Sequence, residues 1–381
     1  MNLSLSDEQV FLREAARGAL SRFKTLEAAR EALDSDTSAL PDLWPTACEA
    51  GWPGLLISDQ HGGAGLDAFD AMLVLGECGR VIAAIQLLGH LPATAILDAA
   101  GDRAPMLDEL ATGAKRAAYL PACPPDDLGH GWTCDPVKGL ARPAAPTVSA
   151  DTPQGGTSGR VDGELGFVPD APGADLLVGV ALKDGQPVAV AIEAGAEGVS
   201  VEPVMRYDAT RSLGHVSLKG APATVLGVPE ETLSGAWHLA QALIAAESLG
   251  SVETALDVSV AYAKERFTFG RAIGSYQAVK HSLTEVLREL ENGRSLLYYA
   301  GWARQGAPGE WPLAASAARS VAGRALDDAA RTMISVHGGI GATWEHDAPL
   351  YFRRAQLSRR LLGGTAGASD RVAGELINQA S

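Results

Sequence analysis

The chain has 381 residues, of which 46% are hydrophobic and 20% are charged, and its formal net charge is −15. This length and composition predict a globular protein of two or three domains with a large buried core. The negative charge excludes nucleic acid and anionic membranes as main partners, because their phosphate groups would repel it, but it allows a local basic site for a phosphorylated cofactor.

The first residues, MNLSLSDEQVFLREAAR, form an acidic amphipathic segment without the basic and apolar regions of a signal peptide. No apolar run approaches the length of a membrane span, so we expect a cytoplasmic protein. Cys48, Cys78, Cys123 and Cys134 lack metal-ligand spacing, and we expect reduced thiols and no metal site. The spacing of Cys123 and Cys134 permits a loop disulfide, which that compartment disfavours.

Residues 1–115 are expected to form an N-terminal helical domain. Ser6 can cap its first helix, and Pro41 suits the first turn of another. A loop with glycine punctuation, GWPGLLISDQHGGAGLD at 51–67, precedes further segments of helical spacing.

Residues 116–227 are expected to form a middle β domain. The segment is dense in proline and glycine, and short β-type runs begin at Leu176, Pro187, Val199 and Gly214. These runs predict a small antiparallel barrel or sandwich. Residues 129–159 are rich in turn residues and are expected to form a long surface loop.

Residues 228–381 are expected to form a C-terminal four-helix bundle. Long segments with one apolar face and short intervening turns occupy 234–266, 275–303, 311–336 and 348–362. The fold class predicted for the whole chain is therefore α+β.

The stretch ERFTFGRAIGSYQAVKH at 265–281 predicts a helix end, a tight turn and a new helix that Ser275 can cap. Arg266 and Arg271 would then lie beside a helix N-terminus, where unpaired N–H groups and a partial positive charge favour a diphosphate. The alternative is a structural helix-turn-helix with exposed arginines.

This stretch resembles the R-x-x-F-G-x-x-I-x-x-x-Q signature of the acyl-CoA dehydrogenase family, through Arg266, Phe269, Gly270, Ile273 and Gln277. HGGIGATWEHDAPLYFRRA at 337–355 and the GW…HGGAGLD segment at 51–67 resemble further family segments. The resemblance covers nearly the whole chain. It implies the acyl-CoA dehydrogenase fold, with the three domains given above.

The resemblance also implies an FAD site shared at a subunit interface. The family uses its elbow and a late glycine segment to hold the adenosine diphosphate arm of a neighbour's FAD. The residues expected at the diphosphate and ribityl region are Arg266, Thr268, Phe269, Tyr276 and Gln277. Those expected at the adenine end lie between Ser335 and Gly339 and include Gly338; Ser335 replaces a glutamine that is frequent in the family.

The base that removes the substrate α-proton is missing from its usual place. In most of the family it is a glutamate before a late Gly-Thr pair, but Gly363 occupies that position. Other relatives carry it on the first bundle helix, at the position of Ala240. The nearest carboxylate on that helix is Glu247, roughly 10 Å further along the axis. We favour a structural ion pair for Glu247 and keep a catalytic role as the alternative.

The family's flavin-ring cradle, a T-E-P-x-x-G-S-D-like segment, is also missing. The corresponding residues at 119–127 read YLPACPPDD and keep neither the acidic residue nor the glycine turn. The chain therefore combines a nucleotide grip with no base and no ring cradle.

This combination predicts the non-catalytic subunit of a heteromeric acyl-CoA dehydrogenase, similar to the α2β2 enzymes that oxidise steroid side-chain thioesters. Its expected partners are a base-bearing paralogue, an acyl-CoA substrate and an electron-transfer flavoprotein as electron acceptor. Two alternatives remain: a self-sufficient FAD enzyme with Glu247 as a relocated base, and an oligomeric scaffold without FAD. The acyl group is left open.

Overall fold

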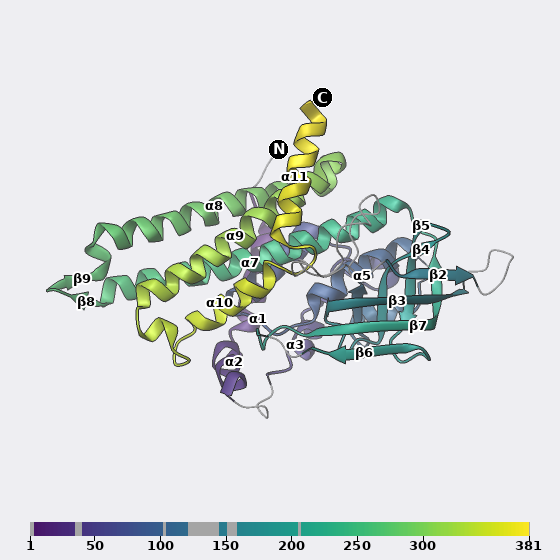
Figure 1. Cartoon of the computed structure of the whole chain (residues 1–381), viewed down its shortest axis with the longest axis horizontal. Helices are drawn as coiled ribbons and strands as arrows, with labels where there is room; N and C mark the ends of the chain where they lie inside the picture. Colours follow the sequence, from purple (N-terminus) through teal and green to yellow (C-terminus); the bar gives the residue numbers. More distant parts are fainter. Residues whose placement is uncertain are drawn as a thin grey trace, which may run out of the picture.

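The computed structural model describes residues 4–34, 40–101, 104–120, 145–150, 158–204 and 207–380. Helices form both ends of the chain, and the strands of the main sheet lie between them in sequence (Figure 1). The long C-terminal helices extend away from this sheet, and the N-terminal helices pack against them. The predicted order of helices, strands and helices is confirmed.

The N-terminal part is helical, and its first helix begins where Ser6 predicts. Ser6 Oγ accepts a hydrogen bond from Gln9 N at 3.2 Å, while Gln9 Oε1 accepts one from Ser6 N at 3.1 Å, which makes a capping box. Pro41 was expected in the first turn of a helix but lies before α3, and Pro45 occupies the first turn of that helix. The helices are α1 (Asp7–Leu20), α2 (Thr25–Asp34), α3 (Trp44–Glu49), η1 (Asp59–His61), α4 (Ala68–Arg80), α5 (Leu87–Ala100) and α6 (Leu107–Thr112).

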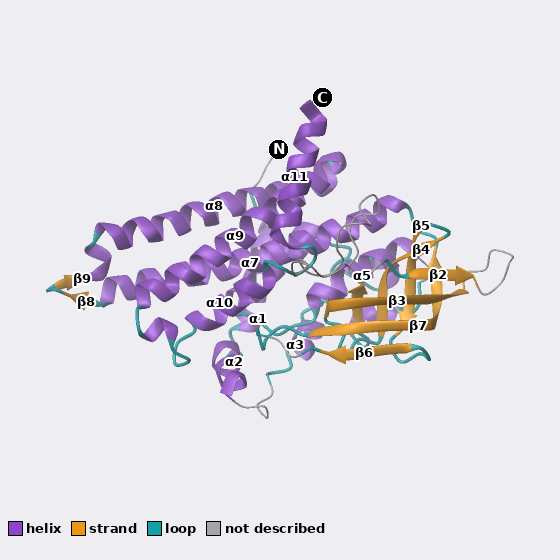
Figure 2. Ribbon diagram, in the orientation of Figure 1, coloured by secondary structure: helices purple, strands orange, loops and turns teal. Residues whose placement is uncertain are grey.

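The middle part is a mixed sheet that closes on itself (Figure 2). The closed path runs β4–β2–β3–β7–β5–β4, with β1 added beside β4 and β6 beside β7. The pairs β1–β4 and β2–β4 are parallel and the others are antiparallel. The prediction of an antiparallel sheet is therefore wrong for these two pairs. The strands are β1 (Ala117–Leu120), β2 (Thr147–Ala150), β3 (Ser158–Pro169), β4 (Leu176–Lys183), β5 (Gln186–Glu193), β6 (Val199–Pro203) and β7 (Leu213–Leu226).

Side chains from the strands form a separate core within this sheet. Leu177 and Val190 are buried with other apolar residues in a cluster apart from the main helical core. β4 reads as a continuous apolar run because both of its faces are covered. The strand therefore contributes Leu176 and Val178 to the main core and Leu177 to the core of the sheet.

The C-terminal part contains the four predicted helices and one more. Helix α7 packs against α9, α8 and α4, and α11 packs against α9. The fifth helix, α11, was not predicted, and it begins at the second residue of a glycine pair. The elements are α7 (Glu230–Glu265), β8 (Phe267–Thr268), β9 (Arg271–Ala272), η4 (Ile273–Ser275), α8 (Gln277–Gly306), η5 (Pro308–Glu310), α9 (Trp311–His337), η6 (Ile340–Ala342), α10 (Ala348–Ser358) and α11 (Gly364–Ala380).

Helices α4 and α7 touch through their backbones, because two glycines remove the side chains between them. A Cβ at Gly79 would lie 1.9 Å from the carbonyl oxygen of Glu247, and one at Gly250 would lie 1.9 Å from that of Gly76. Neither position can carry a side chain unless the helices separate. This contact fixes the N-terminal part on the bundle.

Some predictions concern residues that lie outside the described part of the chain. These are Cys123, Cys134, residues 121–127 of the segment compared with the ring cradle, and most of the loop expected at 129–159. Within that loop, Thr147–Ala150 forms β2, so this part of the prediction is wrong. Cys48 and Cys78 are free thiols. No helix of the described residues has the length and apolar character needed to cross a membrane.

Candidate functional site

The predicted elbow is a short β hairpin at the end of the bundle farthest from the main sheet (Figure 1). After α7 ends at Glu265, β8 and β9 pair with Phe267 opposite Ala272. The two turn residues, Phe269 and Gly270, have φ angles of 49° and 78°, as in the hairpin turns that match the twist of their strands. Phe269 adopts this unfavourable conformation with 94% of its surface exposed.

The helix that follows the hairpin begins without a side-chain cap. Tyr276 holds the N-cap position with extended backbone angles, and its side chain makes no capping hydrogen bond to the first turn of α8. The predicted cap by Ser275 is therefore wrong; Ser275 belongs to η4. The first backbone N–H groups of α8 have no intrahelical partner and are available to a ligand.

Tyr276 connects this helix start to the hairpin. Its hydroxyl donates to the carbonyl oxygen of Thr268 at 3.2 Å. The guanidinium carbon of Arg271 lies 3.9 Å from the centre of the Tyr276 ring, a cation–π distance. Arg266 is exposed, and its side chain has no hydrogen-bond or ion-pair partner among the residues that the structure describes.

A cavity of about 610 Å³ lies between the hairpin, α8 and α9. Thr268, Phe269, Tyr276 and Ser335 line it, so the structure brings together four of the eight residues predicted for FAD. The other four, Arg266, Gln277, Gly338 and Gly339, do not line it. Several lining residues were not predicted for the site, although Ile273 belongs to the signature: Ile273, Ala278, Val279, Ser282, Arg331, Thr332 and Val336.

Helical spacing could have found some of these residues. Thr332 and Arg331 precede Ser335 by three and four positions, which places all three on one face of α9. Arg331 is held in place, because its Nε donates to Asp327 Oδ1 at 3.1 Å and its guanidinium lies 5.2 Å from the Phe352 ring centre.

The chemistry of this cavity fits the nucleotide arm of FAD. Hydroxyl groups, aromatic faces and an uncapped helix N-terminus surround it, and the cation of Arg331 reaches its wall. Nearby, a Cβ at Gly338 or at Gly339 would have nothing within 4 Å, so a ligand can approach the backbone there. No group of His, Cys, Asp or Glu side chains within the described ranges is placed to hold a metal ion.

Glu247 lies elsewhere, in a buried ion-pair cluster between the middle part and the bundle. Its carboxylate accepts from Arg211 Nη2 and, at 2.8 Å, from Arg354 Nη1, and Arg354 also donates to Asp208. Burial acts to raise the pKa of the Glu247 carboxyl, but Arg211 and Arg354 hold it below its ordinary value. The side chain of Glu247 thus serves as a paired anion.

The two positions expected for the base, Ala240 on α7 and Gly363 in the segment before α11, belong to parts of the chain that contact each other. Leu362, Gly363 and Gly364 have φ angles of 54°, 80° and 73°, and Gln241 Nε2 donates to the carbonyl oxygen of Leu362 at 2.8 Å. Ala240, next to Gln241, is fully buried. Neither Ala240 nor Gly363 carries a carboxylate, and Glu247 is engaged with its arginines.

The sequence matches two family descriptions. "Acyl-CoA dehydrogenase, N-terminal domain" covers residues 6–123, and "Acyl-CoA dehydrogenase, C-terminal domain" covers residues 233–375. Acyl-CoA dehydrogenase IpdE2 of Mycolicibacterium smegmatis is 31% identical over 360 residues, which are 94% of this chain and 96% of that protein. Acyl-CoA dehydrogenase FadE34 of Mycobacterium tuberculosis is also 31% identical, over 96% of this chain but only 47% of its own length.

Solved structures agree. A variant of the Tcur3481-Tcur3483 steroid ACAD superposes with a TM-score of 0.85 at 26% identity, covering 99% of both chains. The ChsE4-ChsE5 complex from Mycobacterium tuberculosis gives 0.84 at 23% identity, and PigA with FAD and proline gives 0.81 at 22% identity, each with 99% of both chains covered. The last two likenesses concern the fold alone. Sequence and fold together show that this chain belongs to the acyl-CoA dehydrogenase family.

Proposed function

We propose that this chain is the non-catalytic subunit of a heteromeric acyl-CoA dehydrogenase and that it completes the FAD site of a base-bearing partner. The observation that carries the proposal is a separation: the nucleotide-type cavity is open at the distal end of the bundle, while neither family position for the base holds a carboxylate. An enzyme that removes an α-proton needs such a base. The missing group must come from another polypeptide.

The chain's own residues would hold the adenosine diphosphate arm. Arg266 supplies a free cation, the first turn of α8 supplies N–H donors, and Thr268 and Ser335 supply hydroxyl groups. Phe269 and Tyr276 supply apolar faces that exclude water from the arm. Arg266, Gln277, Gly338 and Gly339 lie outside the cavity lining and would contact the parts of FAD that extend beyond it. When bound, FAD supplies the hydride acceptor of the reaction.

Glu247 has no role as a base in this proposal. A general base must be able to take up a proton near its working pH, but two buried arginines stabilise the ionised form of Glu247. Protonation of this carboxyl would leave both arginines poorly compensated in the interior. The self-sufficient enzyme is therefore the weaker alternative.

The relatives support a two-part assembly. The solved structures of Tcur3481-Tcur3483 and of ChsE4-ChsE5 each pair two named proteins, and the former is described as a steroid ACAD. The region of FadE34 that matches this chain makes up 47% of that protein. In FadE34, a region similar to this chain is thus part of one polypeptide that also contains about as many further residues. We extend to this chain an α2β2 arrangement, a steroid side-chain or similarly bulky acyl-CoA, and an electron-transfer flavoprotein as acceptor.

Co-expression tests the proposal. The chain is purified alone and together with a base-bearing paralogue from the same organism, and flavin absorbance, mass and acyl-CoA-dependent dye reduction are recorded. We expect little FAD and no turnover from the chain alone, and a yellow, active complex from the pair. A yellow, active homo-oligomer of this chain alone would overturn the proposal. If neither preparation binds FAD or acyl-CoA in equilibrium dialysis, the scaffold alternative is correct.

Arg266→Ala in the purified pair tests this chain's contribution to the cofactor. Loss of one charge-assisted contact should weaken FAD binding roughly tenfold without changing the subunit ratio. Arg288→Ala, which removes another exposed arginine of this region, is the matched control, since Arg288 pairs with Glu285 on α8. Equal FAD affinity in the two variants would remove Arg266 from the site.

A further inference from the structure

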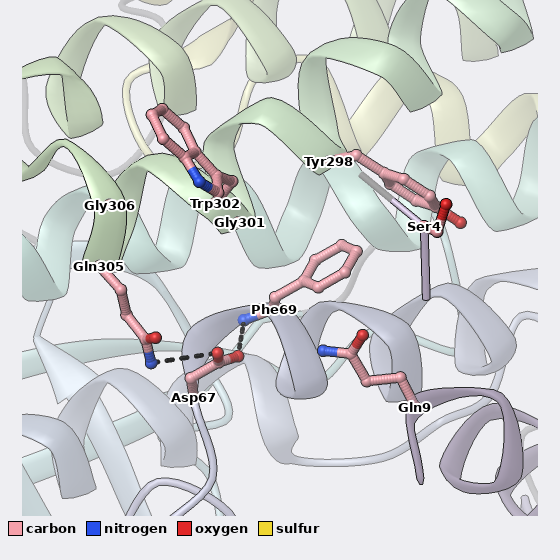
Figure 3. Close-up of a pocket in the computed structure, with 9 residues that line it drawn as sticks. All are labelled: Ser4, Gln9, Asp67, Phe69, Tyr298, Gly301, Trp302, Gln305 and Gly306. Atoms are coloured by element: carbon pink, nitrogen blue, oxygen red, sulfur yellow. Dashed lines mark hydrogen bonds between the residues drawn. The ribbon is translucent and has the colours of Figure 1, made fainter. Parts of the chain in front are cut away.

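A second cavity, of about 340 Å³, lies between the N-terminal segment, α1, α4 and the C-terminal end of α8 (Figure 3). Its α8 residues, from Tyr298 to Gly306, stand more than 20 positions after the start of that helix, so roughly 30 Å separates them from the elbow. The cavity is therefore separate from the proposed nucleotide site and does not depend on it.

Aromatic side chains form much of its wall. The Phe69 ring projects from α4 toward α8 and meets Tyr298 edge-to-face, with centroids 5.0 Å apart (Figure 3). The Trp302 ring stacks on Tyr299 at 5.8 Å. Glycines make room for these rings: a Cβ at Gly301 would lie 2.4 Å from Phe69, and one at Gly306 would lie 2.6 Å from Trp302.

The polar side of the cavity carries negative charge. Asp67 Oδ1 accepts from the backbone N–H groups of Phe69 at 2.7 Å and Asp70 at 3.0 Å, and its Oδ2 accepts from Gln305 Nε2 at 3.1 Å. Oδ2 thus retains acceptor capacity. The nine residues that line the cavity are Ser4, Gln9, Asp67, Phe69, Tyr298, Gly301, Trp302, Gln305 and Gly306, and none of these is basic.

Two helix ends contribute to the field in this cavity. The partial positive charge at the start of α4 is offset by Asp67 and Asp70, which form its capping box. The C-terminal end of α8 brings its partial negative charge and unpaired carbonyl groups to Gln305 and Gly306, and Arg304 in the last turn offsets part of that charge. The Asp67 carboxylate therefore provides the main charge among the lining residues and favours a cation, and the faces of aromatic rings also attract cations.

We propose that this cavity binds an organic cation, an alkylammonium or guanidinium group, which pairs with Asp67 and lies against Phe69, Tyr298 and Trp302. The group can belong to a free amine or to a lysine or arginine side chain of a partner protein. Both sources share the same chemistry, a cation on an apolar stem.

Calorimetric titration of the purified full chain tests the site with two cationic probes. Agmatine represents a free amine, and the blocked tripeptide Gly-Arg-Gly represents a protein side chain. We expect saturable binding of at least one probe, and the tighter probe identifies the source. Pentan-1-ol, a neutral probe with an apolar stem, should bind at least tenfold more weakly. No saturable binding of either cation, or equal binding of the alcohol, overturns the proposal.

Asp67→Asn tests the carboxylate without removing the cap, because asparagine caps helices as well as aspartate does. We expect cation affinity to fall about tenfold while the unfolding transition stays in place. Asp108→Asn, an equal charge change in the exposed first turn of α6, is the control and should bind as the parent does. Trp302→Leu should also weaken cation binding. Unchanged affinity in both cavity variants contradicts the site.

Discussion

The elbow and the cluster around Glu247 use arginines in opposite ways. At the elbow, Arg266 is exposed and unpaired among the described residues, and Phe269 adopts a strained turn conformation in solvent. In the cluster, Arg211 and Arg354 are buried and their charges are matched by Glu247 and Asp208. The first region has groups available to a ligand, and the second uses its charges to join two parts of the fold. The following changes test that contrast.

The largest effect is expected from Glu247→Gln. The substitution removes one of the two buried carboxylates that face Arg211 and Arg354, so about 3–5 kcal/mol of unfolding free energy should be lost. Chemical denaturation measures this loss. Glu253→Gln, on the same helix but partly exposed beside Arg80 and Arg294, should cost no more than about 1 kcal/mol. Similar losses in the two variants would show that the cluster does not hold the fold together.

Asp170→Asn should change the pH dependence of stability. Asp170 Oδ2 accepts from Gly89 N at 2.7 Å, and burial raises the pKa of this carboxyl from 3.8 to about 7. The folded protein therefore keeps a proton that the unfolded chain loses, and stability falls as the pH rises between these two values. Asparagine removes this loss.

The variant should gain on the order of 2 kcal/mol relative to the parent when the pH rises from 5 to 8. Thermal unfolding of both proteins at the two pH values measures the difference. A constant difference between the variant and the parent across this range would mean that Asp170 does not titrate there. Because Arg211, Glu247 and Arg354 all act on Asp170, the result also reports on the cluster.

The smallest effect is expected from Tyr276→Phe at the elbow. The variant loses the hydrogen bond to Thr268 but keeps the ring beside Arg271, so FAD binding by the complex should weaken by about 0.5–1.5 kcal/mol. Tyr276→Leu also removes the ring and should weaken binding further. Fluorescence titration with FAD measures both. Identical affinities of the parent and the leucine variant would place Tyr276 outside the site.

Much of the fold follows from local sequence, because helix periodicity and capping act over a few residues. The cap by Ser6 and the end of the first bundle helix at Arg266 are examples. β1, β2 and β3 were missed, since their pairing depends on strands distant in sequence, and β3 is interrupted by glycines and a bulge. α11 was missed because a glycine pair, here Gly363 and Gly364, is more typical of a helix end than of a helix start.

In the candidate site too, residues close together in the sequence were predicted and contacts between distant residues were not. Thr268, Phe269 and Tyr276 come from one short segment, so a motif brings them together. Ser335 lies on another helix, α9, and only the resemblance to the family predicted that it would belong to the same site. The partners of Glu247 were not foreseen, because Arg211 and Arg354 are 36 and 107 positions away and only tertiary packing aligns them. The partners of a buried charge can therefore be identified only once the three-dimensional fold is known.

The backbone contact between α4 and α7 restricts which sequences this fold can accept. Gly79 and Gly250 each face a carbonyl group at a distance that no methyl group could occupy. A single substitution at either position would push the two helices apart and would weaken the other contacts between them. We therefore expect almost no substitution of these two glycines in natural variants. A substitution there would lower the amount of folded protein, although neither glycine belongs to the candidate site.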